Sequence, residues 1–284
     1  MNGPRWRPLH DVDRRALGEA RLQAHFGAQW LARAARASIA PRPGDGHTNL
    51  GWDNGCLRTH RLSDGARLAL RIADLSLVVQ NPAGDAPSLP LDGRGDADVR
   101  AWLGPLMQTK GLDARLLDAP SPYEMPEHVL ARAGRYARMP ALGALADWFA
   151  NADLALGEIR EGLVNRGLNA PPVRLWPHHF DLDTLVAFTT KEGEDGSMGV
   201  GFSPGDEYYD EPYFYVSLHP APHVTMLPGL PAIGHWHTDD FTAAIATASR
   251  IVAAKGQAAD TMAALRATTD IAVRALMITS DIVR

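Results

Sequence analysis

The sequence is poor in cysteine and lysine, and it contains no long apolar run. Cys56 is the only cysteine among 284 residues, so the chain cannot form an internal disulfide and carries no sign of an oxidising compartment. Lysine occurs at three positions, so arginine supplies nearly all of the positive charge. No run of about eighteen consecutive apolar residues occurs, which excludes a helix that spans a membrane.

The charge balance and the N-terminal residues narrow the class of protein further. The formal net charge of -5 leaves no basic surplus with which to hold the phosphates of a nucleic acid. Residues 1–15 are polar and lack the apolar core of a signal peptide. We therefore expect a cytoplasmic protein that binds neither nucleic acid nor a membrane.

Apolar periodicity and proline positions indicate the fold class. A helix is predicted from Asp11 or Asp13 to about residue 38, and a second amphipathic helix over residues 141–168. Each is followed by a proline-marked loop and then by strand-like runs, within 51–80 and 173–217. The same order of elements therefore occurs twice, which an internal duplication would explain.

We predict an α+β protein in which an antiparallel sheet, built from two helix-hairpin halves, packs with long amphipathic helices. Residues 1–117 would form the N-terminal helix-hairpin-helix half, and residues 118–284 the C-terminal half with the candidate site; one continuous domain is the alternative.

Two further helices are expected near the C-terminus. Thr238 or Asp239 would cap the first, which Gly256 would end, and the second would cover about 258–282. Their alanines suggest close helix packing, either within the fold or in a homo-oligomer.

Two short segments place histidines and carboxylates in a pattern that could bind a metal. If residues 175–188 form one strand, His179 and Asp181 share a face; in the same way, His235 and His237 share a face opposite Trp236. Nitrogen and oxygen ligands of this kind suit zinc, iron or manganese, provided that the two strands are neighbours. The spacing matches no standard metal fingerprint, and histidines that form ordinary hydrogen bonds are the competing interpretation.

The loop of residues 203–213 is a second candidate site. After the turn dipeptide Pro204-Gly205, four acidic residues and three tyrosines follow within eight residues. Carboxylates beside phenols could bind a cationic or hydroxylated ligand, or could act as a general acid and base. The alternative is an acidic surface hairpin whose tyrosines pack on the neighbouring sheet.

The run from Trp176 through Asp181 (W-P-H-H-F-D), together with Ser203 through Val216 (S-P-G-D-x-x-Y-x-E-P-Y-x-Y-V), resembles an uncharacterised bacterial family classed as a domain of unknown function. The likeness is specific over this central segment and poor in the first hundred residues. It implies a shared fold and no established activity. It also implies that one site contains His178, His179, Asp181, Asp206, Tyr208 and Glu211.

Two functions remain open at this point. The first is an enzyme that acts on a small molecule through the His/Asp cluster, with or without a divalent metal such as zinc, iron or manganese. The second is a non-catalytic protein for small-molecule binding or for assembly. The candidate metal ligands are His179, Asp181, His235 and His237. The candidate catalytic residues are His178, His179, Glu207 and Glu211, and the candidate ligand-binding residues are Trp176, Asp206, Tyr208 and Tyr213.

Overall fold

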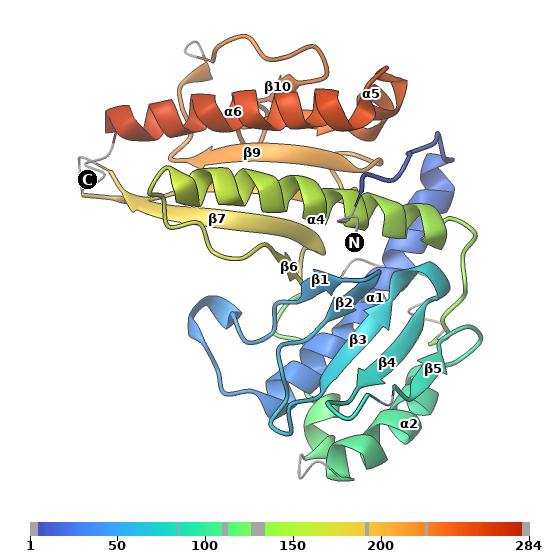
Figure 1. Ribbon diagram of the computed structural model, residues 1–284. Helices are drawn as coiled ribbons and strands as arrows, with labels where there is room; N and C mark the ends of the chain where they lie inside the picture. The colour runs from blue at the N-terminus through green and yellow to red at the C-terminus, as the bar shows by residue number, and fades with distance from the viewer. Residues whose placement is uncertain are drawn as a thin grey trace. The chain divides into compact units, whose positions relative to one another are not determined.

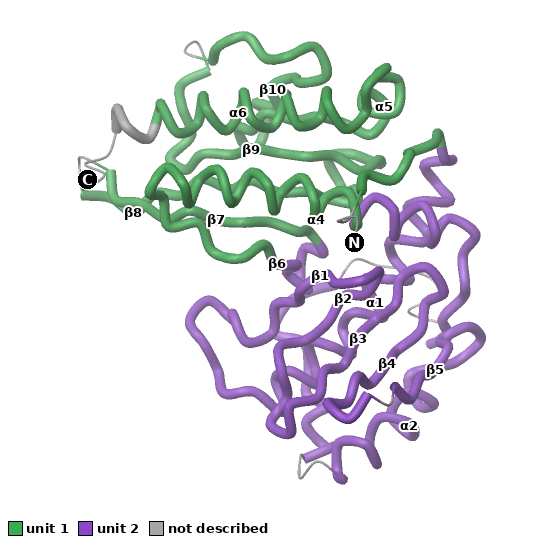
Figure 2. The backbone as a smooth tube through the Cα atoms, viewed as in Figure 1, with its two compact units in different colours: residues 1–11, 150–173, 181–284 green, residues 12–149, 174–180 purple. Residues whose placement is uncertain are grey.

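The chain folds into two compact units, which are described separately. The computed structural model describes residues 5–84, 86–109, 113–125, 134–190, 193–224 and 227–279, with side chains up to residue 275. Unit 1 comprises Met1–Asp11, Ala150–Val173 and Asp181–Arg284, and unit 2 comprises Val12–Phe149 and Arg174–Phe180 (Figure 2). Both units contain helices and antiparallel strands, so the predicted α+β class is confirmed.

The unit boundaries differ from a division at residue 117. The chain leaves unit 2 after Phe149, within a helix, and returns to it for Arg174–Phe180. The strands also form two separate sheets where one had been expected, because the hairpins of the two halves do not pair into a single ladder. The internal duplication stays a prediction.

Unit 2 is built on a meander of short strands and a long helix. The strands are β1 Gly51–Asp53, β2 Cys56–Arg58, β3 Arg67–Arg71, β4 Ser76–Gln80 and β5 Ser88–Pro90, hydrogen-bonded in that order (Figure 1). Helix α1, Arg14–Ser38, is capped by Asp13, whose carboxylate accepts a hydrogen bond from the Ala16 N–H (2.8 Å). Gly27 of α1 lies directly against the Leu70 side chain of β3, so the helix approaches this face of the sheet closely.

The remaining elements of unit 2 are short, apart from one helix. They are the 3-10 helices η1 Pro43–Asp45, η2 Ile72–Asp74 and η3 Ala114–Asp118, the helix α2 Asp96–Thr109 and the strand β6 Arg174–Trp176. Helix α4, Leu142–Asn165, begins in unit 2 and continues in unit 1.

The predicted hairpin over residues 51–80 is confirmed only in its central part. β2 and β3 pair across the turn at residues 63–65, but each of the two predicted strands is divided. Asn54 and Gly55 take positive φ angles of 49° and 81°, so they form a turn that divides the first run into β1 and β2. The second run is divided by η2, after which Leu75 takes a φ of 52°. Four short strands therefore stand where two longer ones were expected.

Unit 1 is an antiparallel sheet covered on one face by helices. Its strands are β7 Asp181–Thr189, β8 Asp195–Ser203, β9 Tyr213–His219, β10 His235–His237 and β11 Ala243–Thr247, in the order β10-β11-β9-β8-β7. Its helices are the second part of α4, α5 Ala248–Ala253 and α6 Gln257–Thr279.

Helices α4 and α6 lie over the same face of this sheet (Figure 1). Arg166, directly after α4, pairs with Asp270 of α6 (2.6 Å). The sheet residues under the helices are apolar and buried; they include Leu182, Val186, Met198, Val200, Phe202, Phe214 and Val216. The helices thus cover the apolar face, and polar side chains gather on the opposite face.

The predicted helix after Thr238 is mostly wrong. Ala243–Thr247 form β11, which pairs with β9 on one side and β10 on the other, and only Ala248–Ala253 are helical. All five residues of β11 are buried, so the sequence shows no alternation of polar and apolar residues that would have indicated a strand. The last helix was predicted correctly over its described residues, Gln257–Thr279.

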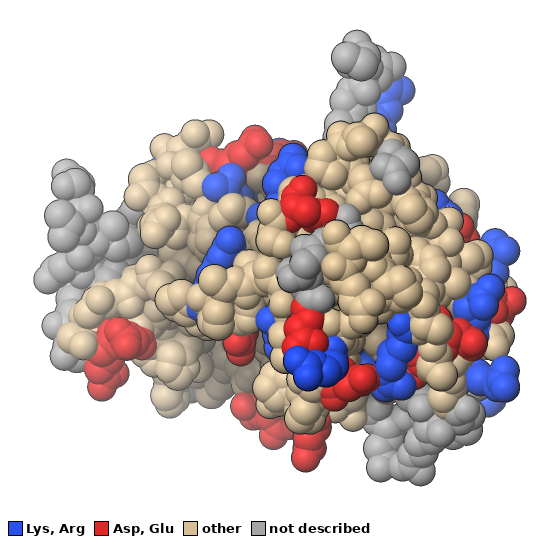
Figure 3. All heavy atoms as spheres, turned by 90° about the horizontal axis from the view of Figure 1, so that it is seen from below, with Lys and Arg blue, Asp and Glu red and all other residues tan. Residues whose placement is uncertain are grey.

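Within the described residues, no helix combines the length and apolar character that crossing a bilayer requires. Acidic and basic side chains are interspersed on the face shown in Figure 3. On that face, neither sign of charge forms one continuous field.

Candidate functional site

The W-P-H-H-F-D run does not form one continuous strand. β6 ends at Trp176, residues Pro177–Phe180 form a turn, and β7 begins at Asp181. The Phe180 N–H donates to the Trp176 carbonyl (2.7 Å), and Phe180 has a φ of 61°. The turn breaks the alternation of side chains, so the prediction that His179 and Asp181 share a strand face is wrong.

His178 and His179 lie at the surface in this turn, as part of unit 2. Their ring centroids are 4.2 Å apart, and the ring of Trp176 lies 6.1 Å from that of His178. Partial desolvation lowers the pKa of His178, and the charge of His179 lowers it further, whereas Asp45 acts in the opposite direction. His178 is therefore held mainly neutral at pH 7.

The turn is anchored from below by buried side chains of α1. The Pro177 carbonyl accepts hydrogen bonds from His25 Nε2 and from Gln29 Nε2, both at 2.8 Å. The Phe180 ring stacks on the His25 ring with centroids 4.8 Å apart. Burial lowers the pKa of His25 to about 4, against the raising effect of its bond to Pro177. His25 is therefore a neutral structural residue.

The four predicted metal ligands do not form one described cluster. His179 belongs to unit 2, and the other three belong to unit 1. Within unit 1, strands β8, β9 and β11 lie between Asp181 on β7 and the histidines on β10. Neighbouring strands are about 4.8 Å apart, so the two outer strands are roughly 19 Å apart, whereas metal–ligand bonds are about 2 Å long. One ion bound by Asp181, His235 and His237 together is therefore ruled out by the strand order.

The described residues form no alternative metal site either. In the part of the chain that the structure describes, no group of three or more His, Cys, Asp or Glu side chains is arranged to hold a metal ion.

The loop between β8 and β9 is organised around Asp206. Its Oδ1 accepts hydrogen bonds from the backbone N–H groups of Tyr208 (2.9 Å) and Tyr209 (3.1 Å). Its Oδ2 accepts from the Tyr213 hydroxyl and, at 3.4 Å, from Ser203 Oγ. Burial and the bond to Asp206 raise the pKa of Tyr213, so this phenol stays protonated. Asp206 thus fixes the loop conformation and aims Tyr208 and Tyr209.

The two glutamates of the loop differ in their surroundings. Glu207 is exposed, whereas only 7% of Glu211 is exposed. The Glu211 carboxylate accepts hydrogen bonds from the Ser249 N–H (2.6 Å) and from Ser249 Oγ (3.0 Å), at the start of α5. This arrangement assigns Glu211 to the capping of α5, and its catalytic assignment has no support in these contacts.

Tyr215 spans two strands on the polar face of the sheet. Its hydroxyl donates to Asp181 Oδ2 (2.7 Å), and its ring lies directly over Gly201 of β8. A Cβ at Gly201 would lie 2.3 Å from the Tyr215 ring, so only glycine leaves room for this contact. Burial, with the charges of Asp181 and Asp183, raises the pKa of Tyr215 well above its ordinary value.

A cluster of three hydrogen-bonding side chains lies beside the loop. The Tyr209 hydroxyl lies 3.0 Å from His235 Nε2 and 3.1 Å from His237 Nδ1, so both histidines point to the same side of β10, as their spacing predicted. The other ring nitrogens, His235 Nδ1 and His237 Nε2, are buried and have no hydrogen-bond partner among the described residues. Phe241 stacks on the His237 ring at 4.2 Å.

Burial and neighbouring charges favour the uncharged forms of two members of this cluster, His235 and Tyr209. Burial lowers the pKa of His235, and the neighbouring charges of Arg250 and His237 lower it further, against the effect of Glu211. Burial and the charges of Asp206 and Asp239 raise the pKa of Tyr209. At pH 7 the His235 ring is therefore mainly neutral, and Tyr209 keeps its proton.

A single phenol proton between two imidazoles restricts their tautomers. With both rings neutral, Tyr209 satisfies both contacts only if it donates to one ring and accepts from the other. If it donates to His235 Nε2, both histidines carry their protons on Nδ1; if it donates to His237 Nδ1, both carry them on Nε2. In either case the two outward nitrogens, His235 Nδ1 and His237 Nε2, comprise one donor and one acceptor.

Tyr209 is the functional candidate that sequence reasoning missed. It was one of three tyrosines in an acidic loop, and nothing local distinguishes it from its neighbour Tyr208. Its role follows from the loop returning to β10, which is 26 residues further along the chain. The His-x-His pattern was the only local signal for this site.

A cavity of about 130 Å³ in unit 2 contains none of the predicted site residues. The Trp30 indole N–H donates to the Tyr136 hydroxyl in its wall (2.8 Å), and the Arg33 guanidinium lies 4.7 Å from the Trp30 ring centroid. Burial and the charge of Asp96 raise the pKa of Tyr136. The cavity therefore has an aromatic wall, and the two arginines Arg33 and Arg135 also line it.

Comparison of the chain with protein-family models, curated proteins and solved structures found no match. The resemblance to the uncharacterised bacterial family therefore stays a prediction, and the site has to be interpreted from its own chemistry.

Proposed function

We propose that the protein is an enzyme that moves a proton within a small carbonyl compound, with Tyr209, His235 and His237 as the relay. The observation that carries this proposal is the shared phenol hydroxyl, 3.0 Å and 3.1 Å from the two imidazoles. Through this hydroxyl, the outward nitrogen that donates a proton is coupled to the outward nitrogen that accepts one, and the site gains no net charge. Such a pair suits a substrate with an acidic C–H next to a carbonyl oxygen.

The proposed step conserves protons and electrons. The bare His237 Nε2 takes a proton from the carbon beside the carbonyl, and His235 Nδ1–H gives its proton to the carbonyl oxygen. The C–H electron pair becomes the C=C bond of an enol, and the C=O π pair forms the new O–H bond. Within the relay, the His237 Nδ1 proton passes to Tyr209 and the Tyr209 proton passes to His235 Nε2. No oxidant, reductant or second substrate is required.

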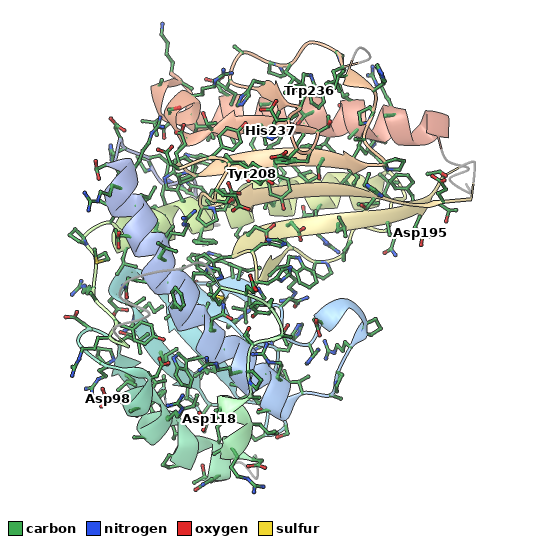
Figure 4. All side chains as sticks on the ribbon, turned by 180° about the vertical axis from the view of Figure 1, so that it is seen from behind. Asp98, Asp118, Asp195, Tyr208, Trp236 and His237 are labelled. Atoms are coloured by element: carbon green, nitrogen blue, oxygen red, sulfur yellow. The ribbon has the colours of Figure 1, made fainter. Side chains whose placement is uncertain are left out.

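Access to the relay would require a side chain to move. Tyr208 lies against His237 with ring centroids 5.6 Å apart and against Phe241 at 5.0 Å (Figure 4). Tyr208 is 42% exposed, although both outward nitrogens are buried. Rotation of this tyrosine away from His237 is the simplest route by which a ligand could reach the relay.

The activity test is hydrogen exchange into a defined set of carbonyl compounds. Pyruvate, acetoacetate and dihydroxyacetone are incubated with the protein in D₂O, and deuterium on the carbon beside the carbonyl is measured by NMR. Tyr209→Phe keeps the ring but removes the hydroxyl, and we expect it to slow the exchange by about 10²-fold or more. Tyr215→Phe is the matched control, because its hydroxyl contacts Asp181 and lies outside the relay. Equal rates in the wild type and Tyr209→Phe would refute the relay, and no exchange with any of the three compounds would refute the carbonyl assignment.

The relay itself can be tested without a substrate. Long-range ¹H–¹⁵N spectra of the histidine rings report which nitrogen carries the proton. We expect His235 and His237 to share one tautomer, both Nδ1–H or both Nε2–H. One ring of each type would show that Tyr209 does not bridge them.

The alternative is a protein that binds a small molecule without reacting with it. Both outward nitrogens are buried, so a substrate cannot reach them directly, and this favours a protein that does not catalyse a reaction. Saturable binding of a carbonyl compound with no isotope exchange would select it over the enzyme.

A further inference from the structure

A row of arginines crosses the second face of the unit 2 sheet, away from α1. The register places Arg58 opposite Gly51 on one side and opposite Ala69 on the other, so these residues point to the same face. Arg67 is two residues from Ala69 on β3 and therefore lies on this face too. The residues between the arginines, Gly51 and Ala69, are small and buried.

Arg174 joins this row from β6. Leu50 and Leu175 exchange backbone hydrogen bonds of 2.9 Å and 2.8 Å, which sets Arg174 beside Gly51. The guanidinium lies over the glycine, because a Cβ at Gly51 would be 2.6 Å from Arg174 Nη1. Gly51 is thus covered by Arg174 and paired with Arg58 on the neighbouring strand, which brings the two arginines close together.

The positive charges at this site exceed the negative ones. Asp53 pairs with Arg58 (2.6 Å), but among the described residues no carboxylate pairs with Arg174 or Arg67. Arg67 donates one N–H to the Thr59 carbonyl (2.5 Å), which leaves its other N–H groups for a ligand.

The arginines also lower the pKa values of neighbouring basic groups. Burial lowers the pKa of Arg174, and the charges of Arg58 and Arg42 lower it further. Burial, then the charges of Arg174, Arg42 and Arg67, lowers the pKa of His60. Half-buried like charges without a counter-charge destabilise a fold unless an anion is bound.

We propose that the face formed by Arg58, Arg67 and Arg174 around Gly51 binds the phosphate group of a small molecule. Guanidinium forks match the oxygens of phosphate in pairs, and a doubly charged anion offsets the surplus of positive charge. Gly51 has no side chain, so the Arg174 guanidinium can lie directly over the strand beside Arg58. This site is formed by unit 2 residues alone, and it does not depend on the relay in unit 1.

Thermal unfolding in the presence of inorganic phosphate tests the site. Sodium chloride of the same ionic strength controls for general screening. The wild type should be stabilised by phosphate beyond the effect of chloride, and Arg174→Met should weaken the apparent affinity by at least tenfold. Arg71→Met is the matched control: Arg71 lies on the same face but forms its own pair with Asp74 (2.7 Å), so its loss should leave the phosphate response unchanged.

Two further measurements separate binding from structure. Arg174→Met should be at least as stable as the wild type without phosphate at low salt, because repulsion is relieved; an arginine with a purely structural role would give a loss. Gly51→Ala removes no charge but displaces the Arg174 guanidinium, so it should also weaken the phosphate response. Equal stabilisation by chloride and phosphate, an unchanged response in Arg174→Met, or an equal loss in Arg71→Met would each overturn the proposal.

Discussion

Replacement of Glu211 by alanine tests whether its carboxylate has a structural or a catalytic role. Only 7% of Glu211 is exposed, and its two hydrogen bonds from Ser249 are 2.6 Å and 3.0 Å long. A hydrogen bond to a charged group contributes about 1.5–3 kcal/mol, and loss of a helix cap costs about 0.5–2 kcal/mol. Ser249 is exposed, so water can replace part of what is lost. We therefore expect Glu211→Ala to lower the free energy of unfolding by about 2 kcal/mol.

Urea unfolding measures this change, and the neighbouring acid is the matched control. Glu207 is exposed, so Glu207→Ala should change the free energy of unfolding by less than about 0.5 kcal/mol. A double-mutant cycle of Glu211→Ala with Ser249→Ala should give a coupling of about 1–2 kcal/mol, because the two side chains share one network. Equal effects of Glu211→Ala and Glu207→Ala, or a coupling near zero, would refute the capping role.

Two other predictions concern the cores of the two units. Gly201→Ala should destabilise unit 1 by about 2 kcal/mol or more, because the new methyl group displaces the Tyr215 ring. Gly18→Ala in α1 has open space around it and should stabilise the protein by about 0.5–1 kcal/mol. Chemical denaturation measures both changes, and equal effects would contradict the packing of Tyr215 on Gly201. Burial lowers the pKa of His25 to about 4. Below about pH 6.5, His25 therefore binds a proton in the unfolded chain but stays neutral in the folded protein. Stability should therefore be fully present above pH 6.5 and fall by about 3 kcal/mol as the pH drops towards 4, and His25→Gln, which can still donate to Pro177, should flatten this dependence; a parallel pH profile would argue against it.

Local sequence signals predicted the long helices well. The apolar period and the Asp13 cap placed α1 correctly, because both act within a few residues. The same signals failed for β11, where Ala244, Ile245 and Ala248 fit a helical period. Ala243–Thr247 instead form a buried strand that pairs with β9 along its whole length and with β10 over its first three residues. A strand with no polar face cannot be told from a helix by periodicity alone.

Only the part of the candidate site that lies on a single strand was predicted, because it follows from the alternation of side chains along that strand. His235 and His237 share a face because they are two residues apart on one strand. Whether Asp181 is their neighbour depends on the order of strands, and no local pattern encodes that order. The turn at Phe180 was missed as well, because its positive φ is taken by a residue type that favours strands.

The repeated passage of the chain between the two units has a consequence for any attempt to produce them separately. A fragment that ends at Phe149 would lack β6 and the following turn. The Leu50 backbone would then lose both of its bonds to Leu175, and His25 would lose its acceptor at Pro177 and its stacking partner Phe180. A stable unit 2 therefore requires Arg174–Phe180 to be supplied in trans or to be joined to Phe149 by a linker that replaces residues 150–173.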